Sequence, residues 1–91
     1  MNDRFVHQQA GLFARRILDS APDQPSRLRF AFTSALGRPP TRDESRRALE
    51  FLQESRAALS SANTPPDQLD ALSWQALARV VFRLNEFAYV D

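Results

Sequence analysis

The chain has 91 residues, a formal net charge of +1 and a hydrophobic content of 43%. This length and composition fit one small domain with a core of its own, and they exclude a disordered tail. The absence of cysteine excludes disulfides, thiolate metal sites and covalently attached haem, and no apolar run approaches the ~20 residues of a membrane span.

Four segments with apolar residues at helical spacing, separated by loops that contain proline, predict an all-α fold: a small bundle of four helices in a single domain over 1–91. The first helix is expected over 3–19 with Asn2 as its N-cap, and the second over 27–36 with Ser26 as its N-cap. Their inward faces are predicted to be Val6, Ala10, Phe13, Ala14 and Ile17 in the first helix and Leu28, Ala31, Phe32 and Ala35 in the second.

The segment ALGRPPTRDE predicts a rigid corner between the second and third helices. Gly37 can take the left-handed conformation that closes a helix, and Pro39 and Pro40 prevent the helix from continuing because they lack a backbone donor. Thr41 and Glu44 have the spacing of a capping box, in which each side chain accepts a hydrogen bond from the other residue's amide. These five residues are therefore interpreted as a structural junction.

The third helix is expected over 42–59 and the fourth over 69–85, with Ser73 as the cap if the fourth helix begins later. The fourth helix is apolar around most of its circumference, which predicts a central position in the bundle. The tail EFAYVD is expected to pack back on the other helices. The predicted inward faces are Ala48, Phe51, Leu52, Ser55 and Leu59 in the third helix and Trp74, Leu77, Ala78, Val81 and Leu84 in the fourth.

Among the large apolar residues that fall outside these inward faces, Phe5, Leu12, Phe30 and Phe82 are the candidates for an interface. Because four short helices cannot easily bury all of them, they predict a second contact surface, toward another copy of the chain or toward the remainder of a parent protein. The alternative is that the loops and the C-terminal tail cover these side chains. The expected function is that of a structural or protein-interaction module that docks through apolar helix surface.

No group of residues in the sequence has the pattern of a catalytic or metal site. His7 is the only histidine, and Asp3 is the one carboxylate near it at helical spacing, whereas such sites need several convergent groups. The serines match no nucleophile elbow, and the chain has no phosphate-binding glycine loop. We therefore expect no enzymatic activity, no cofactor and no metal.

Nucleic-acid binding is the alternative function, because all twelve basic residues are arginine. The second helix, the GRPPT turn and the third helix would form a helix-turn-helix in which Arg38, Arg42, Arg46 and Arg47 face DNA. The Pro-Pro turn, the acidic residues of the third helix and the nearly neutral net charge all disfavour this function. Nucleic acid is therefore not the expected partner.

Three segments read together resemble a known domain: NDRFVHQQAGLFARRI, RLRFAFTSALGRPPTRDESRRALEFL and WQALARVVFRLNEFAYVD. In this order and spacing they are similar to the C-terminal end of the planctomycete surface domain. That domain of unknown function occurs in large multidomain bacterial proteins, which often carry a cytochrome-c-like region further upstream. Arg4 departs from the family pattern, in which a proline precedes the Phe-Val pair.

The resemblance implies a structural module without catalytic residues to transfer. Because the family domain is considerably longer, it implies that 1–91 is the C-terminal fragment of a larger domain, whose upstream part would cover Phe5, Leu12 and Phe30. It also implies a bacterial protein that is exported or associated with the cell surface. The N-terminal sequence MNDRFVHQQAG lacks the basic region and apolar core of a signal peptide.

Overall fold

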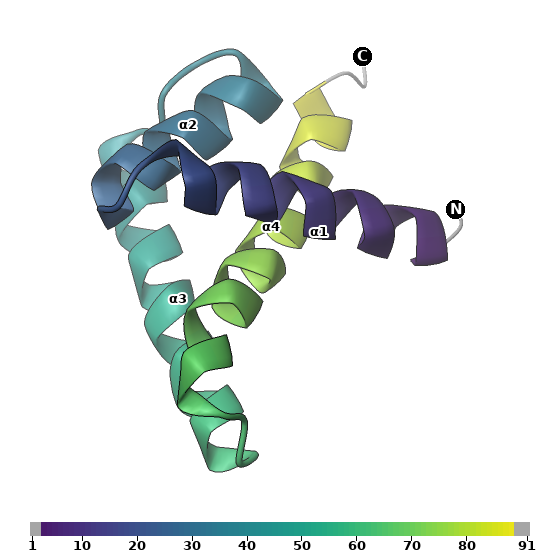
Figure 1. Cartoon of the computed structure of the whole chain (residues 1–91). Coiled ribbons are helices and arrows are strands. Elements are labelled where there is room, and N and C mark those ends of the chain that lie inside the picture. The colour runs from purple at the N-terminus through teal and green to yellow at the C-terminus, as the bar shows by residue number, and fades with distance from the viewer. Residues whose placement is uncertain (1–2, 89–91) are drawn as a thin grey trace.

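The computed structural model describes residues 3–88 of the chain, and it describes side-chain surroundings for residues 8–84. Within residues 3–88 the chain forms helices and no strand, which confirms the predicted all-α fold (Figure 1). In chain order the elements are α1 (Asp3–Ser20), α2 (Gln24–Leu36), α3 (Arg42–Ser61), the short 3-10 helix η1 (Pro66–Gln68) and α4 (Leu69–Ala88).

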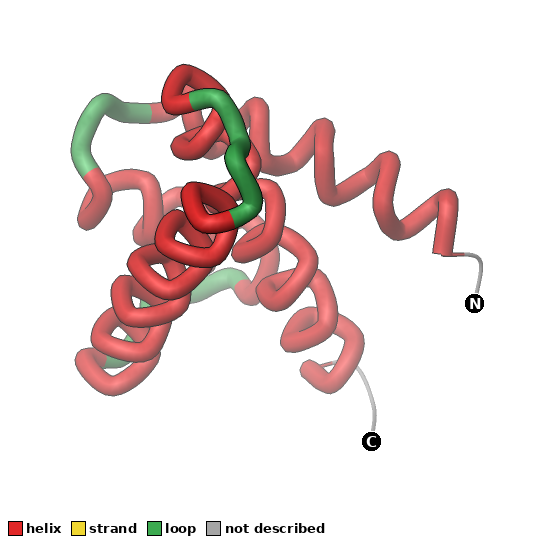
Figure 2. The backbone as a smooth tube through the Cα atoms, turned by 90° about the horizontal axis from the view of Figure 1, so that it is seen from below, coloured by secondary structure: helices red, strands yellow, loops and turns green. Residues whose placement is uncertain are grey.

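The helices pack around α4, which contacts α1, α2, α3 and η1 and is therefore central, as its apolar circumference predicts (Figure 1). α3 and α4 lie together at their connected ends and diverge toward the other end, where α2 lies across the opening. α1 crosses α4 at a steep angle, and its first turns project beyond the other helices (Figures 1 and 2). The molecule consequently extends over 42 × 31 × 22 Å.

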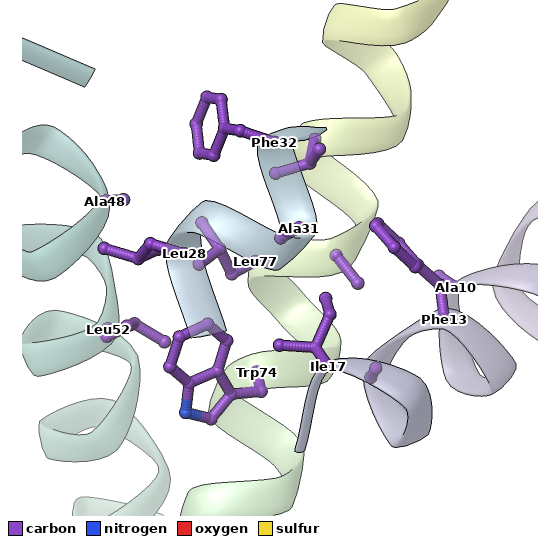
Figure 3. Packing of buried hydrophobic residues seen from close by; sticks show 13 residues of the cluster. Ala10, Phe13, Ile17, Leu28, Ala31, Phe32, Ala48, Leu52, Trp74 and Leu77 are labelled. Carbon is purple, nitrogen blue, oxygen red and sulfur yellow. The ribbon is translucent and has the colours of Figure 1, made fainter. Parts of the chain in front are cut away.

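A single cluster of buried apolar side chains, drawn in Figure 3, holds the four helices together. Every buried hydrophobic residue belongs to an inward face that was predicted from helical spacing. Leu84 is the exception among the predicted positions of α4, because it is 37% exposed and borders a groove between α3 and α4. The buried hydrophobic residues are Ala10, Phe13, Ala14, Ile17, Leu28, Ala31, Phe32, Ala48, Leu52, Trp74, Leu77, Ala78 and Val81.

Small residues allow α1 and α4 to approach closely where they cross. Ala10 and Ala78 are completely buried, and a Cβ added at Gly11 would lie 3.3 Å from Nε2 of Gln75 on α4. A larger side chain at position 11 would have to displace the Gln75 side chain, since 3.3 Å is shorter than an ordinary carbon–nitrogen contact. The absence of a side chain at Gly11 thus leaves room for Gln75 between α1 and α4.

The corner between α2 and α3 has the predicted geometry. Gly37 has φ 75° and ψ 12°, and its amide donates to the Thr33 carbonyl at 3.0 Å, which closes the last turn of α2. The Thr41 hydroxyl accepts a hydrogen bond from the Glu44 amide at 3.1 Å, and the Glu44 carboxylate accepts one from the Thr41 amide at 2.9 Å. The predicted capping box is therefore confirmed.

The predicted N-cap of α2 is wrong, whereas α4 begins at Leu69 as predicted and the alternative later start at Ser73 does not occur. α2 begins at Gln24, three residues before the predicted start, and Asp23 caps it by accepting a hydrogen bond from the Ser26 amide at 3.0 Å. Pro25 fits within this first turn because the amide that it lacks would have no helical partner there. Ser73 lies inside α4, where its buried hydroxyl donates to the Leu69 carbonyl at 2.6 Å. The predicted cap Asn2 lies outside the described residues.

The C-terminal tail also differs from the prediction. Residues 86–88 continue α4 as helix and do not form a segment that folds back on the bundle, while 89–91 lie outside the described residues. Helical backbone satisfies its own hydrogen bonds, and no residue of NEFA breaks a helix, so α4 extends beyond position 85. α3 likewise continues to Ser61, and Asn63 then takes a left-handed conformation with φ 64°.

Candidate interaction surface

Leu12 is the most exposed large hydrophobic residue among the described side chains, at 55%. It borders an open groove of about 620 Å³ between α1 and the first half of α4. Gly11 and Leu18 of α1 and Ala71 and Gln75 of α4 line the same groove. We name this feature the α1–α4 groove. Its lining combines apolar residues with the polar and charged side chains of Gln8, Arg15, Asp19 and Gln75, so it could contact an amphipathic helix surface.

Phe30 and Phe82 are half-buried and pack against the core. The Phe82 ring stacks on the buried Phe13 ring, with 5.1 Å between ring centroids and an interplanar angle of 26°. The Arg16 guanidinium lies 5.8 Å from the centroid of the Phe30 ring and 5.9 Å from that of Phe13. These two predicted interface residues therefore join α1, α2 and α4 within the chain, while the Phe5 side chain lies outside the described residues.

A second groove, which sequence reasoning missed, lies between the first half of α3 and the second half of α4. It encloses about 360 Å³, and Phe32, Phe51, Val80 and Leu84 contribute apolar lining, with charged side chains of α3 at its rim. Val80 and Leu84 are each 37% exposed. Val80 lies off the main apolar stripe of α4. An apolar residue at such a position is the feature of the sequence that could have indicated this groove. We name this feature the α3–α4 groove.

The arginines of the proposed DNA-binding surface are paired with carboxylates of the same segment. Arg38 binds the Glu44 carboxylate through two nitrogens at 2.7 and 3.0 Å. Arg46 binds Asp43 at 2.6 Å and Glu50 at 3.0 Å, and Arg47 binds Asp43 at 2.9 Å. No ion pair involves Arg42 within the described part of the chain. Phosphate binding would have to compete with these local pairs.

Glu44 has the largest resolved pKa shift at the corner. Its hydrogen bonds with Arg38, and next with the Thr41 amide, stabilise the carboxylate and lower its pKa from 4.5 to about 2. The pKa of Asp43 is also lowered, mainly by its hydrogen bond with Arg46. These charged groups are satisfied within the corner and support its structural role.

Acid should weaken the corner through Glu44. Because the folded-state pKa lies below the ordinary value of 4.5, the stability contributed by this carboxylate is complete above that pH and is lost as the pH falls toward 2. We expect Glu44→Gln to lower the free energy of unfolding at pH 7 and to have much less effect near pH 2. Urea unfolding of both chains at the two pH values measures this difference.

Glu54→Gln is the matched control for that experiment, because Glu54 lies on the same helix, is exposed and has no ion pair among the described residues. It should leave the stability unchanged within about 0.5 kcal/mol at pH 7. An equal destabilisation by Glu44→Gln at both pH values would contradict the assignment of the pH dependence to this carboxylate.

Arg27 forms a cluster of contacts that local sequence patterns do not reveal. Its guanidinium donates to the Ala21 carbonyl at 2.7 Å and to Asp70 of α4 at 3.2 Å, and it lies 5.7 Å from the centroid of the Trp74 ring. Asp70 also binds Arg56 of α3 at 3.3 Å. The Arg27 side chain is only 15% exposed. The cluster connects the α1–α2 loop to α3 and α4, so its role is structural.

Among the described residues, no three His, Cys, Asp or Glu side chains gather where they could hold a metal ion. His7 belongs to the part of α1 whose side chains are not described. No described helix combines the length and the apolar character that crossing a membrane requires. The sequence matches no protein-family model, and comparisons with curated proteins and with solved structures find no match.

Proposed function

We propose that this chain is a helical structural module that binds another protein surface through apolar helix faces. The observation that carries the proposal is the exposure of Leu12, Val80 and Leu84 along two grooves, outside a core that is already closed. Exposed apolar side chains that border a groove gain free energy when a partner removes them from water. The local pairing of Arg38, Arg46 and Arg47 supports protein binding over binding of nucleic acid.

The resemblance to the end of the planctomycete surface domain gives this module a biological setting. In that setting the chain is a bacterial helical unit of an exported or surface-associated protein, and it packs against neighbouring helical structure. The proposal requires no catalytic group, because burial of apolar surface is sufficient to hold such units together.

A hydrophobic dye tests whether the folded chain offers apolar surface. We expect anilinonaphthalene sulfonate to fluoresce with the native chain at pH 7 and low micromolar concentration. The double variant Leu12→Gln/Leu84→Gln should lose most of this signal and keep the helical circular dichroism spectrum, since both side chains are exposed. Thr33→Gln is the control, because Thr33 is exposed and lines neither groove. Dye fluorescence that appears only on unfolding would overturn the proposal.

A further inference from the structure

We draw no further inference here: the strongest candidate, the α3–α4 groove with Phe51, Val80 and Leu84 in its lining, carries none, because the charged side chains at its rim are paired within the chain and nothing in the part of the chain that the structure describes shows what covers it.

Discussion

Trp74→Ala is expected to destabilise the chain by about 3–5 kcal/mol, the usual range for removing a large aromatic side chain from a core. Trp74 is completely buried on the central helix α4, and the Arg27 guanidinium lies 5.7 Å from its ring centroid (Figure 3). A domain of this length has a total stability on the order of 5–14 kcal/mol, so the loss would leave a marginal or unfolded protein. Urea unfolding followed by circular dichroism measures the loss.

The variant Trp74→Phe distinguishes the effect of the apolar indole ring on stability from the effect of its buried N–H group. Trp74 Nε1 is buried and is the one such side-chain atom without a hydrogen-bond partner among the described residues. Phenylalanine keeps most of the apolar ring and removes this unsatisfied donor, so the avoided desolvation cost offsets part of the cavity cost. We expect a loss well below that of Trp74→Ala. Equal losses for the two variants would show that Nε1 has a partner, such as an ordered water.

The helices and their buried faces could be predicted because the information is local. A period of 3.6 residues determines which side chains share a face, and every buried hydrophobic residue of the described chain lies on a predicted face. The corner is equally local, because Gly37, the two prolines and the Thr41–Glu44 pair act within eight residues. Each of these residues restricts the backbone directly, whatever the rest of the chain does.

The contacts between distant segments could not be predicted in this way. Arg27 and Asp70 are 43 residues apart, and no pattern along the sequence connects them. The sequence places both on helices, but only the crossing of α1, α2 and α4 brings their charges together. The predicted start of α2 was wrong for a local reason. Asp23 and Ser26 are both good N-caps, and which of them begins the helix depends on where Pro25 is accommodated.

The surface residues show a further limit of helical spacing. Phe82 lies off the main stripe of α4, and it still stacks on Phe13 because α1 crosses α4 steeply and uses a second side of the helix. Leu84 lies on that stripe, and it is exposed because it borders an open groove between α3 and α4. Crossing angles therefore decide which apolar residues remain for a partner, and these angles depend on the whole set of packed residues.

Leu77→Ala is expected to cost about 2–5 kcal/mol, and Leu84→Ala less than about 1 kcal/mol. The two leucines lie two turns apart on α4, but Leu77 is 2% exposed and Leu84 is 37% exposed. Both variants replace a leucine of the same helix with alanine. The difference between their losses in free energy of unfolding therefore measures burial by the surrounding helices. Thermal and urea unfolding give both values. A small effect at Leu77 would contradict the central position of α4, since that position requires α4 side chains to fill the space between the other helices.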